Sequence, residues 1–330
     1  MVRALVDAGI HQDEELLTRP VDWLLNQQIT DREIGDWRVY RPTVCAGGFA
    51  FEYNNKWYPD VDDTAVGAVA LLHHDPSLAN HASVSSAAAW ILGMQNKNGG
   101  WAAFDADNDA FYLNDLPFAD MDSLCDPSTP DVVGHVLEFF GLLFQLAREY
   151  KIKNPDMVKL LPKARASCTR SIAYLARTQE EFGSWYGRWG INYLFGTSAV
   201  LSGLAYFVDG DSRVPDMCAA GVKWLSVRQN QDGGWGETTE SYKDKRLAGV
   251  GKSAPSQTAW ALMGLLGFLN IKDAIIEKGV APAGGVAGTW PEEQYTATGF
   301  PGQFYLKYQL YSHYFPMMAL GRYRSLTGVD

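Results

Sequence analysis

Three aspartates, Asp60, Asp62 and Asp63, are the residues of this sequence best placed to do acid–base chemistry. They directly precede an apolar run at 66–72, so the pattern predicts a helix that begins at the acids. One aspartate can cap that helix, and the others suit the positive end of its dipole. Capping requires only one of them, however. Carboxylates crowded at a partly dry site cannot all ionise at low cost, so one can stay protonated and act as a general acid.

The composition is that of a folded, acidic protein. The 330 residues carry 28 Lys and Arg against 38 Asp and Glu, and the resulting net charge of −10 argues against a nucleic-acid partner. Hydrophobic residues make up 47% of the chain, with 11 Trp, 16 Tyr and 15 Phe, which is enough for a substantial core. A chain of this length fits one large domain or two small ones.

The cysteines and the N-terminus indicate the compartment. Cys45, Cys125, Cys168 and Cys218 form no CxxC pair and have no metal-ligand spacing, so we expect reduced thiols and an intracellular protein. The first nine residues lack the sustained apolar core of a signal peptide. The longest apolar stretches fall short of a membrane-spanning helix, so we expect any membrane contact to be peripheral.

The elements that must position the acids are predicted to be helices of two kinds. Amphipathic stretches, which suit an outer layer, occur at 21–28, 85–94, 164–178 and 219–229. Stretches that are apolar on nearly every face, and therefore suit an interior, occur at 64–72, 132–146, 197–207, 258–269 and 305–320. The alternation predicts an all-α fold in which an outer ring of helices surrounds an inner ring, an α/α barrel.

A short turn recurs at the ends of the amphipathic stretches. A glutamine stands six residues before a tryptophan, with glycine between them, at 95–101, 179–185 and 229–235. We expect the glycine to form the turn and the glutamine amide to hydrogen-bond the turn backbone or a neighbouring helix. A looser first copy runs from Gln28 to Trp37. In a fifth copy, before Trp290, the proline and glycines at 281–288 predict that the helix is lost.

Together these features resemble one known family. The recurring turns, Asp-Val-Asp-Asp-Thr-Ala at 60–65, Gly-Arg-Trp-Gly at 187–190 and Gly-Phe-Pro-Gly at 299–302 are similar to those of class II triterpene cyclases, specifically squalene-hopene cyclases. The similarity runs from about Ala4 to Tyr323. It implies an α6/α6 double-layered toroid, with residues 1–330 forming a single catalytic barrel domain. Family members are much longer and carry a second barrel, which we expect to be absent from this chain.

The resemblance also assigns roles to the acids. It implies that Asp62 is the proton donor, that Asp60 and Asp63 are its companions, and that His135 hydrogen-bonds the donor. A cationic histidine beside a carboxyl group favours the deprotonated form and so makes the group a stronger acid. Protonation of an isolated double bond requires a strong acid in a dry site, because an alkene is a very poor base.

Aromatic side chains are expected to stabilise the cation that protonation creates, since their faces attract positive charge without acting as nucleophiles. Phe304, Tyr308 and Tyr311 have the spacing of one helical face. Phe104 and Phe195 stand where bacterial hopene-forming relatives are expected to have Tyr, and loss of these hydroxyls can alter where cyclisation stops. The positions that match the family's substrate cavity are Trp37, Phe51, Phe104, Trp189, Phe195, Phe300, Phe304, Tyr308 and Tyr311.

Further acids are expected to support the site without holding a metal. Asp126 and Asp131 match carboxylates near the donor in the family, and each can equally cap a helix. The acidic run at 105–109 resembles the start of a calcium loop but lacks Gly at the sixth position and Glu at the twelfth, so we interpret it as a solvated loop. The motif also differs from the DDxxD with which class I terpene synthases bind magnesium. The resemblance implies an enzyme without a cofactor.

By this resemblance the chain is an isomerase that converts squalene, or a related linear polyprene, to a polycyclic triterpene such as hopene, with hopanol from a hydro-lyase side activity. It implies peripheral contact with a membrane and leaves open whether the chain forms a homodimer. The alternative is an inactive half-length cyclase that binds isoprenoids or a partner. An α/α-barrel glycosidase is disfavoured because the inner stretches offer few groups for sugar hydroxyls. A zinc-dependent prenyltransferase subunit is disfavoured because no cysteine joins a recognisable ligand set.

Overall fold

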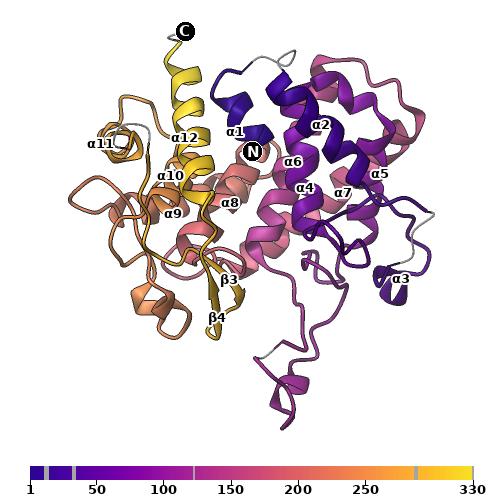
Figure 1. Cartoon of the computed structure of the whole chain (residues 1–330), viewed down its shortest axis with the longest axis horizontal. Coiled ribbons are helices and arrows are strands. Elements are labelled where there is room, and N and C mark those ends of the chain that lie inside the picture. Colours follow the sequence, from indigo (N-terminus) through magenta and orange to yellow (C-terminus); the bar gives the residue numbers. More distant parts are fainter. Residues whose placement is uncertain (11–14, 32–34, 122, 286–288, 329–330) are drawn as a thin grey trace.

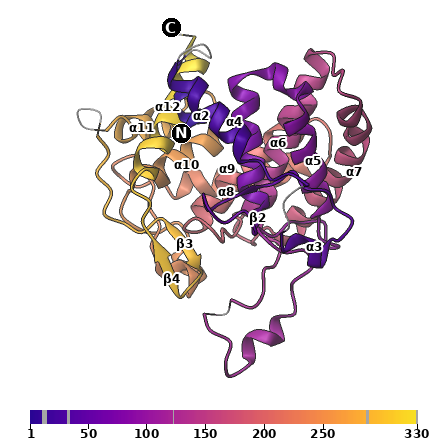
Figure 2. The ribbon, with the colours of Figure 1, turned by 45° about the vertical axis from the view of Figure 1, so that its right-hand side comes forward.

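The acids lie at one end of a closed ring of helices. The computed structural model describes residues 1–10, 15–31, 35–121, 123–285 and 289–328. Among these residues, six helices form the ring, each packed against the next, with the last packed back on the first (Figures 1 and 2). They are α1 (Val2–Asp7), α4 (Val61–His74), α6 (Pro130–Glu149), α8 (Tyr193–Leu204), α10 (Pro255–Leu265) and α12 (Tyr311–Thr327).

A second layer of helices surrounds this ring. Helix α2 lies against α1 and α4, α5 against α4, α7 against α6, α9 against α8 and α10, and α11 against α10 and α12. The outer helices are α2 (Glu15–Gln27), α5 (Ala82–Gly93), α7 (Pro155–Thr178), α9 (Val214–Val227) and α11 (Ala274–Ala283). The two layers confirm the predicted α/α toroid.

Burial explains why the two sets of sequences differ. Every residue of α10 from Ser256 to Leu265 is buried, because this helix has protein on all sides. Helix α7 buries only one stripe, which includes Ala164, Cys168 and Leu175 at spacings of one and two turns. The polar residues of the outer helices therefore face solvent, and the inner helices have few positions that tolerate them.

Short elements join the helices. Strand β1 (Phe49–Ala50) pairs antiparallel with β2 (Pro59–Asp60), and β3 (Ala297–Phe300) pairs antiparallel with β4 (Phe304–Leu306). The segment between α5 and α6 projects away from the ring, and Figure 1 shows it in purple at the bottom. The single-turn helices are α3 (Trp37–Tyr40), η1 (Pro76–Asn80), η2 (Phe111–Asp115), η3 (Ala205–Phe207), η4 (Thr239–Tyr242) and η5 (Lys245–Leu247).

The recurring turns share one geometry. Gly99, Gly183 and Gly233 all have positive φ, at 92°, 98° and 89°. A side chain at any of them would also collide with a backbone carbonyl of the next outer helix, so glycine is required twice over. Gln179 Nε2 donates to the Gly183 carbonyl at 2.8 Å and to the Met217 carbonyl of α9 at 2.9 Å. The glutamine amide therefore bonds both its own turn and the neighbouring helix.

The first and fifth copies differ from the prediction. Gln28 Nε2 donates to the Gly47 carbonyl at 2.7 Å and to the Ser83 carbonyl of α5 at 2.8 Å, so the first turn ends at Phe49 and not at Trp37. An insertion between glutamine and glycine concealed this copy. In the fifth copy, the predicted loss of helix is wrong for 281–283, because α11 continues through Pro282 to Ala283. Residues 286–288 lie outside the described residues.

The stretch at 305–320 is not one helix, contrary to the prediction. Gly302 has φ +81° at the turn between β3 and β4, and the Thr298 hydroxyl donates to the Phe304 carbonyl at 2.9 Å across the hairpin. Helix α12 begins only at Tyr311. The Pro-Gly turn reverses the chain before a helix can start, so Phe304, Tyr308 and Tyr311 do not share a helical face.

Helix α6 corrects another expectation. The helix has 20 residues, and an 18-residue window of it has a mean hydropathy of 1.2, which is long and apolar enough to cross a membrane, whereas we expected every apolar stretch to be too short. Of that 18-residue window, 83% is buried inside the protein. The helix is apolar because it stands inside the ring between α4 and α8.

Candidate active site

The acid cluster lies where β2 runs directly into α4. Asp60 is extended (φ −118°, ψ 130°) and caps the helix, because its carboxylate accepts a hydrogen bond from the Asp63 N–H at 2.8 Å. The Thr64 hydroxyl donates to the Asp60 carbonyl at 2.5 Å and accepts from the Phe49 N–H at 2.8 Å, which ties the helix start to β1. Capping therefore occupies Asp60 and leaves the carboxyl group of Asp62 for another contact.

That contact is a histidine from the next inner helix. His135, in the second turn of α6, places Nδ1 at 2.5 Å from Asp62 Oδ1. Phe195 of α8 packs edge-on against the imidazole, with the ring centroids 5.7 Å apart. The structure thus brings together the two residues that the family resemblance paired, and the Phe195 ring packs against the histidine.

The charges of the cluster redistribute its protons. Burial, with repulsion from Asp62, raises the pKa of Asp63 to about 7. Burial and both neighbouring aspartates raise the pKa of Asp60 well above its usual range. Burial opposes a charge on His135, but attraction to Asp62 overcomes it and raises the His135 pKa to about 9. At neutral pH the histidine is a cation, and the three carboxyl groups share fewer than three negative charges.

A cavity of about 580 Å³ opens over the cluster, a size typical of small-molecule sites. Its wall combines the acids with aromatic side chains from several loops. The predicted residues that line it are Phe51, Asp60, Asp62, Asp63, Phe104, Asp126, Trp189, Phe300, Tyr308 and Tyr311.

Ring contacts orient this aromatic wall. The rings of Phe104 and Trp189 meet edge to face with centroids 5.7 Å apart. Phe51 meets Tyr308 in the same way at 6.3 Å, and Tyr308 lies 4.8 Å from Tyr311. Such pairs prefer edge-to-face or offset geometry, so each ring limits the rotation of its neighbour. The wall is therefore built from side chains that fix one another.

Three predicted wall residues lie elsewhere. Trp37 is fully buried, donates its indole N–H to the Val44 carbonyl at 3.2 Å and does not line the cavity. Phe195 lies behind the histidine, 4.9 Å from Trp260 between ring centroids. Phe304 is in β4 and is 47% exposed outside the lining. Their spacing in sequence did not reveal that one belongs to the core, one supports the histidine and one follows a turn.

Asp126 and Asp131 hold the loops that carry the aromatic wall. Asp126 Oδ2 accepts hydrogen bonds from the Phe104 N–H at 2.7 Å and from the N–H of the following residue at 3.0 Å. Asp131 Oδ2 accepts from the Arg188 N–H at 2.8 Å and from the Trp189 N–H at 3.0 Å. Burial raises the pKa of both carboxyl groups. Arg188 Nε also lies 3.9 Å from Asp126 Oδ1. The two carboxylates therefore hold loops, and neither is the N-cap of α6, which is Thr129.

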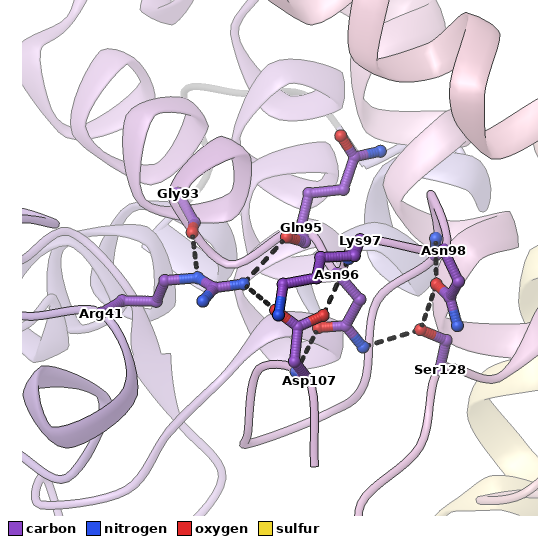
Figure 3. A network of polar contacts seen from close by, with 9 residues as sticks. Arg41, Gly93, Gln95, Asn96, Lys97, Asn98, Asp107 and Ser128 are labelled. Atoms are coloured by element: carbon purple, nitrogen blue, oxygen red, sulfur yellow. Dashed lines mark hydrogen bonds and ion pairs between the residues drawn. The ribbon is translucent and has the colours of Figure 1, made fainter. Parts of the chain in front are cut away.

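A polar network joins Asp107, in the loop that follows Phe104, to the recurring turn at 95–101 (Figure 3). Arg41 donates to the Gln95 carbonyl at 3.3 Å and to Asp107 Oδ2 at 2.8 Å. Asn96 accepts from the Asp107 N–H at 2.8 Å and donates to Ser128 Oγ at 2.7 Å. The recurring turn at 95–101 is thereby bonded to the cavity loop and to the segment that enters α6.

Sequence reasoning missed several lining residues. Asp105 belongs to the run interpreted as a solvated loop, yet it lines the cavity, and burial raises its pKa. That interpretation is wrong for Asp105, because the hydrogen bond from its N–H to Asp126 holds the loop at the cavity. Arg188 also lines the cavity, with its guanidinium 5.1 Å from the Trp189 ring. The other missed lining residues are Asp36, Glu52, Asn55, Tyr58, Ser123, Cys125, Thr298, Gly299 and Leu306.

Within the described parts of the chain, no group of three or more His, Cys, Asp or Glu side chains has an arrangement that holds a metal ion. Asp62 instead contacts His135, and Asp60 accepts a hydrogen bond from the Asp63 N–H. Burial raises the pKa of Asp60. The arrangement is thus equipped for proton transfer by its own side chains.

The fold is that of type II terpene cyclases. The ent-copalyl diphosphate synthase from Streptomyces platensis superposes with a TM-score of 0.60 at 16% identity, over 99% of this chain and 49% of that one. The type II terpene cyclase MstE from Scytonema superposes with a TM-score of 0.59 at 18% identity, over 99% and 87% of the two chains.

The chain belongs to the squalene-hopene cyclase C-terminal domain family, whose model matches residues 1–325. It is 44% identical over 328 residues to a squalene hopane cyclase from Aspergillus fumigatus, covering 90% of this chain and 44% of the relative. It is also 44% identical over 332 residues to the squalene-hopene cyclase from Alicyclobacillus acidocaldarius, covering 98% and 49%. The chain therefore spans about half the length of these curated relatives.

Proposed function

We propose that this protein catalyses protonation-initiated cyclisation of squalene, or of a related linear polyprene, to a polycyclic triterpene such as hopene or hopanol. The observation that carries the proposal is the 2.5 Å contact between Asp62 and His135 beneath a cavity with an aromatic wall. The family membership supports the reaction class. The relatives named above are squalene cyclases, and we extend their substrate to this chain.

Asp62 is the proposed general acid. The cationic His135 donates its Nδ1–H to Asp62 Oδ1, which leaves Oδ2 to carry the acidic proton. A proton on a carboxyl group beside a cation is lost more easily, and a weakly basic alkene requires such an acid. Asp60 and Asp63, whose pKa values are raised, limit the negative charge that would otherwise hold that proton back.

The proton adds to the terminal double bond of the substrate and leaves a carbocation, which each ring closure moves along the chain. Aromatic faces stabilise such a cation by roughly 0.5–2 kcal/mol each and form no lasting bond with it. Trp189, Phe104 and Tyr311 are the proposed wall for this purpose. Loss of a proton from the final cation gives an alkene, and capture of water with loss of a proton gives an alcohol, so the proton count balances.

The open side of the cavity gives a second candidate function. Phe51 lines the cavity and is 55% exposed, so the described residues leave this side of the wall open. Tyr58 also lines the cavity and is exposed, and Tyr53 and Trp57 in the same segment are exposed. These exposed aromatic side chains support the proposal that an intracellular chain makes peripheral contact with a membrane or pairs with a second copy. A chain that binds isoprenoids without cyclising them is the alternative.

Incubation of the purified chain with squalene in detergent, followed by gas chromatography and mass spectrometry, distinguishes the two functions. Cyclic triterpenes are expected from the parent chain. Recovery of unchanged squalene that copurifies with the protein would instead support the binding function. A matched incubation with the exposed variant Glu149→Gln controls for handling, since this residue lies outside the cavity.

A further inference from the structure

A second cavity lies at the opposite end of the ring. Its volume is about 420 Å³, and all six inner helices, or the turns that directly follow them, contribute to its lining. Helix α4 shows that the two cavities are far apart, because Asp62 lies in its first turn and His73 in its last. At 1.5 Å per residue, the backbone positions of these two residues are about 16 Å apart. The second cavity therefore does not belong to the acid site.

The floor of this cavity is a balanced group of buried charges. Arg3 donates from Nη1 to Glu138 Oε2 at 3.2 Å, and its Nη2 contacts Glu138 Oε1. Arg322 lies 3.4 Å from Glu138 Oε1 and 3.7 Å from Asp7 Oδ2. The Arg3, Asp7 and Glu138 side chains are each more than nine-tenths buried. Two guanidinium groups thus face two carboxyl groups, and the set is close to neutral.

Three buried atoms of this group have no hydrogen-bond partner among the described residues: Arg3 Nε, Asp7 Oδ2 and His73 Nε2. All three residues line the cavity. Burial, with repulsion from Arg3, lowers the pKa of His73 to about 4, so the imidazole is neutral at pH 7. Arg3 Nε and Arg322 Nε lie 3.9 Å and 3.7 Å from Asp7 Oδ2, so these groups form ion pairs but are too far apart for a hydrogen bond. The floor consequently has a donor on Arg3 and an acceptor on Asp7 that lack a hydrogen bond among the described residues. Buried polar atoms are normally paired, so these point to a ligand that is both acceptor and donor.

The remaining wall is largely apolar. Val6, Met263, Leu266 and Leu326 line it, and Leu326 at the rim is exposed. A carbon skeleton therefore fits the wall, while a polar group fits the floor. A ligand with a net charge would disturb the balance of Arg and carboxyl groups, which favours a neutral molecule.

We propose that this cavity binds a neutral alcohol, with the hydroxyl group on the floor formed by Arg3, Asp7 and His73 and the hydrocarbon part against Met263 and Leu266. A hydroxyl group suits the floor because it donates one hydrogen bond and accepts others. The site is independent of the proposed cyclisation, so its test requires no turnover.

Borneol is a suitable probe, with camphor and bornylamine as matched controls. The three share one carbon skeleton, but camphor only accepts hydrogen bonds and bornylamine is charged at pH 7. The readout is the ¹³C-labelled ε-methyl resonance of Met263, identified through Met263→Leu. Borneol is expected to shift this resonance saturably, and camphor and bornylamine to bind at least 10-fold more weakly. The resonance of Met217, which does not line the cavity, is the internal control.

Two variants locate the binding. Leu266→Trp fills the second cavity and is expected to abolish the borneol shift, whereas Leu306→Trp fills the acid-site cavity and is expected to leave it unchanged. His73→Phe keeps a ring of similar size, removes the unpartnered nitrogen and is expected to weaken borneol at least 10-fold, with little change for camphor. No saturable shift, equal affinity for all three probes, or loss of binding only in Leu306→Trp would overturn the proposal. Circular dichroism confirms the fold of each variant, and His73→Phe remains decisive if Leu266→Trp does not fold.

Discussion

The two ends of the inner ring place partly buried histidines in opposite electrostatic settings. His135 contacts Asp62, and its pKa rises to about 9 although burial opposes the charge. His73 is also partly buried but faces Arg3 without a carboxylate contact, and its pKa falls to about 4. Burial alone would lower both. The difference shows that the paired carboxylate, and not depth in the ring, decides which histidine is a cation at neutral pH.

The acids at the two ends differ in the same way. At the acid site, aspartates outnumber cations, so burial and mutual repulsion raise the pKa values of Asp60 and Asp63 and protons are retained. At the other end, burial opposes ionisation of Glu138, but Arg3 and His135 override it and lower the Glu138 pKa. Burial nevertheless raises the pKa of Asp7 at this end to about 6, so Glu138 is the carboxyl group held ionised there. The acid site, by contrast, raises the pKa values of two neighbouring carboxyl groups and favours their protonated forms. A proton donor for an alkene requires the arrangement of the acid site.

The largest expected effect comes from breaking the balanced end. Glu138→Gln removes the carboxylate that buried Arg3 and partly exposed Arg322 share and leaves them with their longer contacts to Asp7. Loss of one partner from a buried ion pair costs about 3–5 kcal/mol of unfolding free energy. Urea unfolding measures this loss. The control is Glu149→Gln on the same helix, where the side chain is exposed and the change is expected to stay near zero. Equal stability of the two variants would show that the Arg–Glu group does not hold the ring closed.

The fold is expected to lose stability when His135 loses its charge at high pH and when His73 gains a charge at low pH. The folded-state pKa of His135 is raised from 6.5 to about 9, so its contribution is present below pH 6.5 and is lost as pH rises to 9. The folded-state pKa of His73 is lowered from 6.5 to about 4, so unfolding is favoured as pH falls through this range. Each shift corresponds to at most roughly 3–4 kcal/mol.

Urea unfolding from pH 4 to 9.5 tests these windows by difference. Asp62→Asn is expected to flatten the profile between pH 6.5 and 9, and His73→Phe to flatten it between pH 4 and 6.5. Each variant is the control for the other window. A change by Asp62→Asn in the acidic window alone would contradict the assignment of the cation to His135.

A smaller effect is expected from the loop anchors of the acid site. Asp126→Asn weakens the hydrogen bonds to the loop that begins at Phe104, and misplacement of a cavity wall can cost about 10- to 100-fold in turnover. Turnover of squalene is the measurement, with Asp156→Asn, exposed in the first turn of α7, as the control. An unchanged rate and product pattern would mean that the loop is held by packing alone.

The smallest effect concerns the support of the histidine. Phe195 contacts the His135 ring and does not line the cavity, so Phe195→Tyr is expected to leave product identity unchanged. Phe104→Tyr, which adds a hydroxyl group within the lining, is expected to change product ratios severalfold. Product ratios by gas chromatography distinguish the two. The reverse outcome would place Phe195 in contact with substrate.

Local patterns were sufficient to predict the layers, whereas the pairing of Asp62 with His135 was predicted from the family resemblance. Apolar and amphipathic helices alternate in sequence, and the acids stand at a recognisable helix start. The β3–β4 hairpin was missed because one Pro-Gly turn reverses an apolar run that otherwise has helical spacing. The first recurring turn was misplaced because its glycine lies far from Gln28.

Contacts between distant segments could not be predicted in this way. Asp126 and Asp131 precede or begin α6, as capping residues do, and their partners in the Phe104 and Trp189 loops become visible only in the folded chain. The charged group at the other end joins α1, α6 and α12, so no local spacing reveals it. Burial and charge balance are properties of the whole ring.

The most direct test of the central claim is cyclisation of squalene in D₂O, comparing the parent chain with Asp62→Asn by mass spectrometry. The parent is expected to give a cyclic product with one deuterium in the first ring formed, because the initiating proton comes from an acid that exchanges with solvent. Asp62→Asn is expected to lower the rate by about 100- to 10,000-fold while circular dichroism remains unchanged. A product without deuterium, or undiminished formation of labelled product by Asp62→Asn, would contradict the assignment of Asp62 as the acid that starts the reaction.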